Sequence, residues 1–392
     1  MRILSISSIL PVPGITTENT FVLESYRQLL AGSPEDEVLI LKPFRLNTNP
    51  RKMGQQNNPL KHLRKGKSFS VEGFRVEALP FLSTWRFRSL HALVCETLFL
   101  INRKRIMRIL KDFPADIIHA QYILPDGMLA RKLSRKLGIP YLLTTHNERF
   151  YFEHRYSGKV ALSLLRDARY ILPLNHSNYT YFRSRGIYNI HMAPLGFDPV
   201  FLREQKKEKP AKIRIITVSV LVKLKNIDQV IRAVKRLANE YDIEYQIVGE
   251  GPERTALQSL IGELGMAKVV SLTGRKDKEE VAEAMYQSDI FIMPSYFETF
   301  GRVYFEAMAM GVPIVCARAS GISGLFKEGR EGFSVSHRDL NEITETLRML
   351  ISNNELRKSV GKAGQKMVKN YTWDKVAADL RKRYSMALET QA

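Results

Sequence analysis

Short apolar runs alternate with longer amphipathic stretches through this 392-residue chain, and this alternation restricts the fold more than any other feature. The short runs have the length of buried strands, and the stretches between them carry apolar residues at helical spacing. Strands that alternate with helices form parallel sheets, with the helices packed on their faces. The predicted strands are Ile3–Ile6, Val38–Leu41, Ile117–His119, Tyr141–Thr144, Tyr170–Leu172, Ile213–Val218, Tyr245–Val248, Val269–Leu272, Ile290–Met293 and Ile314–Val315. The fold class is therefore α/β.

A charged segment divides this alternation into two halves. It reads REQKKEKPAK from Arg203 to Lys212, with one proline and few apolar residues, which is typical of a linker. A single core stops growing near about 250–300 residues, so this chain is long enough for two. We expect two doubly wound, Rossmann-like domains that face a cleft, residues 1–203 and 204–370, with ligand at the carboxyl ends of the strands. Helices are predicted in the second half at Ile227–Leu237, Glu253–Leu264, Glu279–Tyr286 and Arg302–Met310.

The cysteine content and the hydropathy indicate a cell compartment. Cys95 and Cys316 are the only cysteines and lie far apart in the sequence, which favours a reducing compartment over a disulfide framework. The first residues, MRILSISSILPVPG, are typical of a strand and a turn and not of a secretory signal. No apolar stretch approaches the roughly 18 residues that a membrane-spanning helix needs. We expect a cytoplasmic protein, soluble or peripheral on the membrane.

The net charge of +20 is concentrated in one segment. Between Arg51 and Lys111, 14 basic residues accompany only Glu72, Glu77 and Glu96. The first part of this segment is polar and typical of a loop, and Trp85, Leu90, Leu93, Leu98 and Ile101 then follow at helical spacing. Basic charge among apolar and aromatic residues indicates an anionic membrane surface or a nucleic acid. A core helix with a solvated basic end is the alternative for the apolar stripe.

The stretch from Asp289 to Gly311, DIFIMPSYFETFGRVYFEAMAMG, predicts a ligand site. A strand ends at Pro294, a polar loop follows, and helix-forming residues begin near Gly301. The backbone N–H groups at the helix start (Gly301, Arg302, Val303 and Tyr304) would attract an anion such as phosphate. Glu298 and Glu306 flank this helix start, and carboxylates accept hydrogen bonds from pairs of sugar hydroxyls. A phosphate cradle between two diol-binding carboxylates fits a nucleotide sugar, although either Glu taken singly is common at a helix start.

The whole string closely resembles the E-x7-E signature of retaining glycosyltransferases of family 4. The resemblance includes Pro294 and Ser295 before the first Glu, Glu306–Ala309, Gly311 and Pro313, and it is strongest from Val269 to Val335. It implies the GT-B fold, with an acceptor-side domain at residues 1–203, a nucleotide-sugar-binding domain at residues 204–370, and a helix at residues 371–392 that returns to the first domain. It also implies transfer of a sugar, with retention of configuration, from a nucleotide-diphosphate donor to a lipid-linked or polysaccharide acceptor.

The same resemblance assigns the catalytic roles and most of the donor contacts. Glu306 would bind the ribose diol and Glu298 the donor sugar, and Phe300 and Gly301 would let the backbone approach that sugar. Lys225 would neutralise the diphosphate. Val220 occupies a position where the family has an arginine, so one charge is either missing or supplied from elsewhere, for example by Lys223 or Arg302. His146 would lie near the donor sugar, and we interpret His119 as structural.

Three further parts of the sequence match the family's pattern less specifically. Gly249 lies in VGEGP, which resembles the GxGP turn that shapes the nucleotide pocket. Arg275 and Lys276 are candidate contacts to the base. Gly14 lies in the loop expected near the phosphate, where Asn19 replaces a glycine of many relatives.

No cluster of Asp or His residues indicates a metal, so we expect no metal and no cofactor besides the nucleotide-sugar co-substrate. A dinucleotide-dependent oxidoreductase is an alternative, although Arg254 replaces the third glycine of its fingerprint. A basic nucleic-acid-binding protein is another alternative, suggested by charge alone. We favour the glycosyltransferase acting at an anionic membrane, with no nucleic acid as partner.

Overall fold

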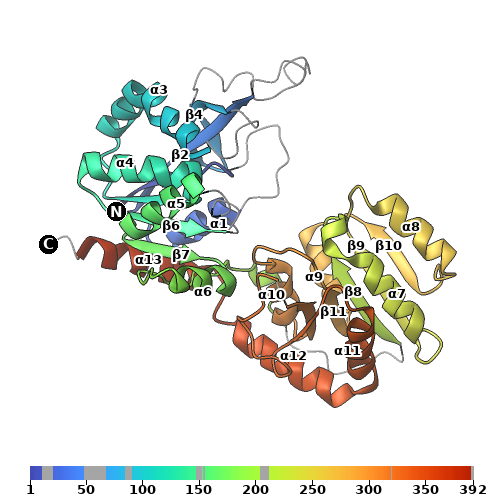
Figure 1. Ribbon diagram of the computed structural model, residues 1–392. Helices are drawn as coiled ribbons and strands as arrows, with labels where there is room; N and C mark the ends of the chain where they lie inside the picture. The colour runs from blue at the N-terminus through green and yellow to red at the C-terminus, as the bar shows by residue number, and fades with distance from the viewer. Residues whose placement is uncertain are drawn as a thin grey trace. The chain divides into compact units, whose positions relative to one another are not determined.

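The structure is a computed structural model that describes residues 1–10, 21–47, 68–83, 91–146, 152, 155–203, 212–318 and 320–389. The chain forms two compact units (Figure 1). The first comprises Met1–Leu174, Asn178–Pro194 and Trp373–Ala392, and the second comprises Asn175–Ser177 and Leu195–Thr372. Residues 195–203, which the sequence placed in the first domain, therefore belong to the second unit.

The first unit contains a seven-stranded sheet in the order β3-β4-β2-β1-β5-β6-β7. Its strands are β1 (Arg2–Ile6), β2 (Glu37–Asn47), β3 (Ser68–Val71), β4 (Phe74–Ser83), β5 (Ile117–Ala120), β6 (Tyr141–Thr145) and β7 (Tyr170–Pro173). All neighbouring strands are parallel except β3 and β4. The carboxyl ends of β5 and β6 therefore meet at one edge of the sheet.

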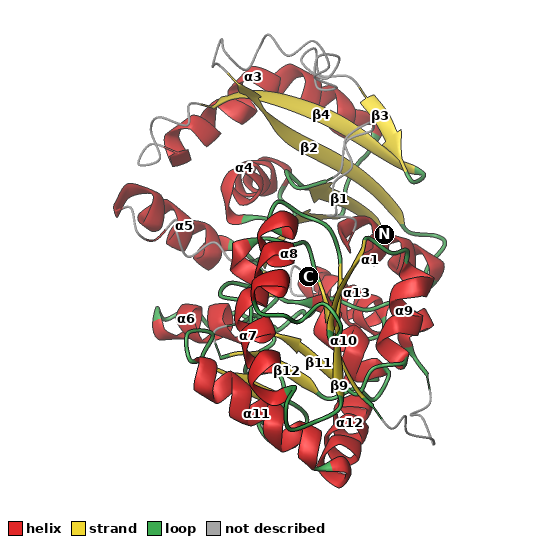
Figure 2. Ribbon diagram, turned by 90° about the vertical axis from the view of Figure 1, so that its right-hand side faces the viewer, coloured by secondary structure: helices red, strands yellow, loops and turns green. Residues whose placement is uncertain are grey.

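Helices pack on both faces of this sheet because successive side chains of a strand point to opposite faces. On one face, Ile118 and Leu143 pack in a core that includes side chains of α3 (His91–Asp112), α4 (Met128–Leu137), α5 (Arg155–Asp167) and α6 (His176–Ser184). On the other face, Ile117 and Leu142 pack with α1 (Phe21–Ala31) and α13 (Trp373–Glu389). Figure 2 shows α3 lying along β4.

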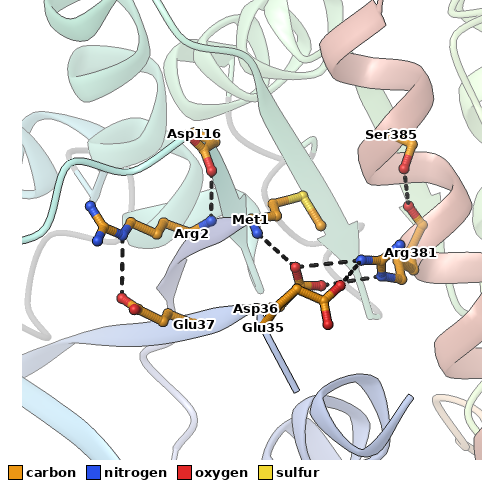
Figure 3. Close-up of polar contacts among 8 residues, drawn as sticks. All are labelled: Met1, Arg2, Glu35, Asp36, Glu37, Asp116, Arg381 and Ser385. Carbon is orange, nitrogen blue, oxygen red and sulfur yellow. Dashed lines mark hydrogen bonds and ion pairs between the residues drawn. The ribbon is translucent and has the colours of Figure 1, made fainter. Parts of the chain in front are cut away.

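Ion pairs join the final helix to the beginning of the chain (Figure 3). Arg381 of α13 lies 3.2 Å from Asp36 and 2.8 Å from Glu35, which precede β2. The side chain of Asp36 is fully buried and also accepts a hydrogen bond from the N-terminal amine of Met1 at 2.7 Å. Two cations thus compensate one buried carboxylate, which joins α13 to the first unit.

The second unit contains a parallel six-stranded sheet in the order β10-β9-β8-β11-β12-β13. Its strands are β8 (Ile213–Val218), β9 (Ile243–Val248), β10 (Val270–Gly274), β11 (Ile290–Met293), β12 (Ile314–Ala317) and β13 (Phe333–Val335). One face packs on α7 (Ile227–Leu237), α8 (Arg254–Glu263) and α11 (Leu340–Ser352). Phe291 points to the opposite face and packs edge-on against Tyr304 of α10 (Arg302–Ala309). Helices α9 (Lys278–Tyr286) and α12 (Asn354–Val368) contact α10 there.

The structure confirms the α/β class with two parallel-sheet domains, and every predicted strand is present. The sequence did not predict β3, β4 or β13. Strand β4 contains Pro80 and pairs with β2, which contains Pro43, and proline argues against a strand. Strand β13 has only three residues, too few for a recognisable pattern.

The apolar stripe predicted for the basic segment is partly wrong. Leu98 is buried, but Leu93 and Ile101 are 51% and 55% exposed on α3. The side chains of α3 that pack in the core instead form a stripe that includes Cys95 and Ile106. Helix α3 has two apolar stripes, and spacing alone does not tell which one faces the sheet. Trp85 and Leu90 lie outside the described residues.

Candidate active site

The stretch from Ile290 to Ala309 forms the predicted strand, loop and helix. Helix α10 begins after Gly301, whose φ of 77° lies in the left-handed region. A Cβ at Gly301 would lie 2.5 Å from the ring of Tyr304 and 3.0 Å from Cγ of Glu298. Both the backbone conformation and the space therefore require glycine. This bend brings Glu298 beside the first turn of α10.

Two of the predicted donor contacts are core residues. Phe300 is 2% exposed, and its ring stacks on Phe305 at 4.8 Å. Tyr304 is fully buried, and its hydroxyl donates to the carbonyl of Met293 at 2.5 Å. Its N–H donates to the carbonyl of Gly301 at 3.0 Å, so the prediction that this N–H is free is wrong. The anion contacts at Gly301, Arg302 and Val303 stay predictions.

Lys225 and Glu298, which the sequence predicted as catalytic residues, form an ion pair. Lys225 ends the 3-10 helix η6 (Lys223–Lys225) in the loop between β8 and α7, and its Nζ lies 2.5 Å from Oε2 of Glu298. The two side chains are only 19% and 17% exposed. The N–H of Tyr296 donates to the carbonyl of Leu224 at 2.8 Å, which joins the two loops. Because β8 and β11 are parallel neighbours, both loops leave the same edge of the sheet.

Glu306 belongs to a second group of charged side chains, which also includes Arg302, Lys278 and Asp198. Its Oε1 lies 3.2 Å from Nε of Arg302, one turn earlier on α10, and its side chain is 12% exposed. Burial raises the pKa of Glu306, and the nearby Arg302 opposes this shift. Lys278, at the start of α9, pairs with Asp198 at 2.5 Å. Burial alone would raise the pKa of Asp198, but the hydrogen bonds from Lys278 and from the N–H of Val200 outweigh it and lower the pKa.

Two glycines pack the loop after β9 against the loop after β8. Gly249 has a φ of 140°, and a Cβ there would lie 1.8 Å from the carbonyl oxygen of Ser219. A Cβ at Gly251 would lie 2.4 Å from the carbonyl oxygen of Leu221. The N–H of Leu221 donates to the carbonyl of Glu250 at 2.9 Å. The glycines that suggested a dinucleotide site are thus explained by contact between two loops.

Arg275 and Lys276 follow β10, and their side chains differ in surroundings. Arg275 is exposed, whereas Lys276 lies 3.4 Å from Glu280 of α9. Lys276 also lines a cavity of about 640 Å³ over the first residues of β8, β9 and β10. Of the predicted site residues only Lys276 lines this cavity, so it is separate from the Lys225–Glu298 pair.

In the first unit, His146 directly follows β6 at the carboxyl edge of the sheet. It is 4% exposed and stacks on Tyr122 at 4.5 Å, with Phe21 at 5.4 Å. Burial lowers the pKa of His146 to about 3, so the imidazole is neutral at physiological pH. A neutral ring can donate or accept a hydrogen bond but supplies no positive charge. Gly14 lies outside the described residues.

His119 is structural, as predicted. Its Nδ1 lies 2.6 Å from the hydroxyl of Tyr384 on α13, and its Nε2 lies 2.7 Å from Oγ1 of Thr144. Both ring nitrogens therefore have partners within the core of the first unit.

The described residues form neither a metal site nor a membrane span. No group of three or more His, Cys, Asp or Glu side chains in that part of the chain is arranged to hold a metal ion. None of the helices that the structure describes is long and apolar enough to cross a bilayer.

Comparison with known proteins identifies the family. The family described as Glycosyl transferases group 1 matches residues 201–367, and Glycosyltransferase Family 4 matches residues 68–201. The two matches are contiguous and together span residues 68–367. The chain belongs to glycosyltransferase family 4.

Relatives of this glycosyltransferase include proteins of different kinds. An uncharacterized glycosyltransferase of Methanocaldococcus jannaschii is 27% identical, over 73% of this chain and 80% of its own length. A sulfoquinovosyl transferase of Arabidopsis thaliana is 28% identical, over 72% of this chain and 59% of its own. An MMP alpha-(1->4)-mannosyltransferase of Mycolicibacterium hassiacum is 32% identical, over 51% of this chain and 49% of its own.

Solved structures show the GT-B fold. Sucrose-phosphate synthase from Thermosynechococcus elongatus matches with a TM-score of 0.72 and 18% identity, over 99% of both chains. Anabaena HepE in complex with UDP matches with a TM-score of 0.70 and 17% identity, over 98% of this chain and all of the other.

Val220 occupies the position where the resemblance implies an arginine. Val220 is 37% exposed and follows β8 in the loop that also carries Lys225. Lys223 is exposed in that loop, and Arg302 is already paired with Glu306. The expectation that Lys223 or Arg302 supplies the missing charge stays a prediction.

Sequence reasoning missed Asn175, Gly321, Asp198 and Lys278. The carbonyl of Thr299, next to Glu298, accepts a hydrogen bond from the amide of Asn175 at 2.9 Å. A Cβ at Gly321 would lie 2.1 Å from the same oxygen. Asn175 and Gly321 are far from Thr299 in sequence, so no local pattern predicts these contacts. Asp198 carried one signal, since Asp before Pro199 is typical of a helix cap.

Proposed function

We propose that this glycosyltransferase is a retaining enzyme that moves a sugar from a nucleotide-diphosphate sugar to a lipid-linked or polysaccharide acceptor. We place it at the cytoplasmic face of the membrane, in cell-surface polysaccharide biosynthesis. The observation that carries the proposal is the pairing of two carboxylates with two cations around the first turns of α10.

The chemistry of these pairs suits a nucleotide sugar. A diphosphate needs positive charge, which Lys225, Arg302 and the N–H groups at the start of α10 supply. Sugar and ribose hydroxyls need acceptors, which Glu298 and Glu306 supply. Binding of the donor would exchange each internal ion pair for contacts with the ligand. The HepE structure, which holds UDP, supports a nucleotide-diphosphate donor for this chain.

In the transfer step, negative charge develops on the leaving diphosphate. Lys225 and the backbone N–H groups of Gly301 and Arg302 would stabilise this charge without reorganising, and such stabilisation accounts for most of the rate enhancement in many enzymes. Glu298, released from Lys225, would hold the donor sugar. The neutral imidazole of His146 would contribute a hydrogen bond near that sugar, and no metal ion is needed in this scheme.

Replacing Glu306 by Ala should weaken binding of the nucleotide diphosphate by about ten- to a hundredfold. A hydrogen bond to a charged acceptor contributes about 1.5–3 kcal/mol, and the ribose would lose its acceptor. Calorimetric titration with UDP and GDP measures the effect. Glu345→Ala is the matched control, because Glu345 also pairs with an arginine on a helix, at 3.3 Å, but lies on α11. Equal affinity in wild type and Glu306→Ala would contradict the ribose assignment.

A ligand comparison tests the proposal against the two alternatives. A ligand present at 100 times its dissociation constant stabilises the folded protein by about 2.7 kcal/mol. Thermal unfolding should therefore shift with UDP or GDP and stay unchanged with NAD and with an oligonucleotide. A mass-spectrometric screen of donor sugars with sugar-lipid acceptors then identifies the reaction. A shift with NAD alone would favour the oxidoreductase.

The outward face of α3 supports docking on an anionic membrane. Its first half exposes Leu93, Leu100 and Ile101, which are 51%, 67% and 55% exposed. Its second half exposes Lys104 and Arg108 on the same face, since positions four or seven apart share one side of a helix. An amphipathic helix with apolar and basic residues on its outer face is typical of interfacial binding. The basic residues Lys61, Arg64, Lys65 and Lys67, which the sequence suggested for this surface, lie outside the described residues.

Changing Lys104 and Arg108 together to Gln should weaken binding to anionic vesicles about thirtyfold. Each basic residue near an anionic leaflet contributes about 1 kcal/mol, so two contribute about 2 kcal/mol. Co-sedimentation with vesicles of anionic or neutral lipid measures binding, and high salt should release the protein. The control is the double change of Lys362 and Lys366 to Gln, since both are exposed and four residues apart on α12. Equal pelleting with anionic and neutral vesicles would contradict the proposed docking.

A further inference from the structure

Two buried residues of opposite charge lie at the carboxyl edge of the first sheet. Lys42 of β2 is 4% exposed, and Asp126 of the short helical segment η3 (Ile123–Gly127) is fully buried. Ile6, the last residue of β1, pairs with Leu41, so Lys42 lies just beyond the end of β1. Burial lowers the pKa of Lys42 to about 8, and the nearby Asp126 opposes this shift. Lys42 is therefore mostly protonated at physiological pH.

Both side chains bind the segment that leaves β1. The Nζ of Lys42 donates to the carbonyls of Ser8 at 3.0 Å and Leu10 at 2.6 Å. The carboxylate of Asp126 accepts a hydrogen bond from the N–H of Ser8 at 3.0 Å. Two buried opposite charges contribute little to stability by themselves, because the loss of hydration offsets their attraction. They can instead fix one conformation, here that of residues 8–10 against η3.

Segment η3 continues directly from the residues that surround His146. Tyr122 immediately precedes η3, and its carbonyl accepts a hydrogen bond from the N–H of Gly127 at 2.8 Å. The ring of Tyr122 stacks on His146, with ring centroids 4.5 Å apart and planes inclined by 11°. The backbone of Gln121 forms a hydrogen bond with the side chain of His146. The position of η3 therefore determines how Gln121 and Tyr122 meet the imidazole.

We propose that Lys42 and Asp126 are positioning residues that hold η3 and thereby orient the imidazole of His146 for sugar transfer. The proposal rests on the proposed function, in which His146 contributes a hydrogen bond near the donor sugar. Neither charged side chain touches a substrate in this scheme, since both act through the backbone of Ser8 and through η3. A displacement of about 1 Å in an active site can lower a rate about a hundredfold, so these buried contacts affect turnover.

Nuclear magnetic resonance of the His146 imidazole tests this proposal without a substrate. Asp126→Asn removes the charge but keeps an oxygen that can accept from Ser8. It should shift the His146 signals, which a His146→Ala variant assigns, because these signals depend on the ring stacked against the imidazole. Asp36→Asn is the matched control, since the side chain of Asp36 is also fully buried but precedes β2, at the opposite edge of the sheet. It should lower the unfolding temperature and leave the His146 signals in place. Unchanged His146 signals in folded Asp126→Asn would overturn the proposal, as would an equal shift in Asp36→Asn.

Transfer kinetics, with the donor and acceptor that the mass-spectrometric screen identifies, test the consequence for turnover. Asp126→Asn and Lys42→Met should each lower turnover about ten- to a hundredfold and leave the affinity for UDP or GDP within about twofold of the wild type. Asp36→Asn should keep its turnover. The loss in Asp126→Asn should vanish in a His146→Ala background, since the effects of residues that act through one another do not add. Losses that multiply in the double variant would overturn the proposal alone. Full activity in His146→Ala would refute the role that the proposed function gives to His146, and this proposal with it.

Discussion

Glu298→Ala should lower the rate of sugar transfer by about a hundred- to a thousandfold and leave the affinity for the nucleotide diphosphate nearly unchanged. Removal of one preorganised electrostatic contact to the transition state typically costs this much. Glu298 lies at the entrance to α10 beside Gly301, whereas the ribose contact is assigned to Glu306, further along the helix. Steady-state transfer kinetics and nucleotide titration, run on the same preparation, separate the two effects. Full activity in Glu298→Ala would remove this carboxylate from the mechanism.

Lys225→Ala distinguishes an electrostatic role from a merely structural one. In the wild type, the affinity for UDP or GDP should fall as salt rises, because salt screens the contact between Lys225 and the diphosphate. Without that charge the affinity should be lower at low salt and should respond less to added salt. Lys358→Ala is a suitable control, since Lys358 is also paired with a carboxylate, that of Glu355 at 3.2 Å, and lies on α12 outside the candidate site. An unchanged salt response in Lys225→Ala would assign the diphosphate to backbone and other side chains.

The sequence predicted the helices and strands around the candidate site better than it predicted which side chains pair with one another there. Helix α7 has the predicted bounds, and the strand, loop and helix around Glu298 are confirmed. The ion pair of Lys225 and Glu298 joins residues 73 positions apart, and only the parallel neighbours β8 and β11 bring them together. Pairing between distant loops depends on strand order, which local periodicity does not contain.

The two histidines show the same limit, because a sequence pattern gives their positions on the strands but not the residues that surround them. His119 and His146 both lie at the ends of strands of the first sheet, and burial lowers the pKa of each to about 3. What distinguishes them is packing. His119 is enclosed by Tyr384 and Thr144, whereas His146 packs against the rings of Tyr122 and Phe21. Both residues lie at the predicted strand ends, but their neutrality depends on aromatic neighbours from other elements, which the sequence pattern does not reveal.

The two glycines after β9 illustrate an ambiguous sequence pattern. A glycine pair between a strand and a helix suggested the alternative of a dinucleotide site, because such glycines let a backbone approach a ligand. Here the same freedom lets one backbone approach another, with Gly249 against Ser219 and Gly251 against Leu221. The spacing of glycines shows that another group approaches the backbone closely. It does not show whether that group is a ligand or another part of the backbone.

Gly249→Ala should therefore destabilise the second unit by about 3–5 kcal/mol, even without ligand. Its φ of 140° is a conformation that residues with a Cβ rarely adopt, and the new Cβ would lie 1.8 Å from the carbonyl oxygen of Ser219. Gly262→Ala is the matched control, since Gly262 lies in α8 and a Cβ there would have nothing within 4 Å, and it should stabilise by about 0.5–1 kcal/mol. Thermal unfolding of the two variants measures the contrast. A dinucleotide cradle at Gly249 requires the opposite result, with normal unfolding of Gly249→Ala and a loss confined to NAD affinity. Opposite shifts in the two glycine variants would instead identify the GxG turn as the packing contact that holds the loop of Lys225 in position.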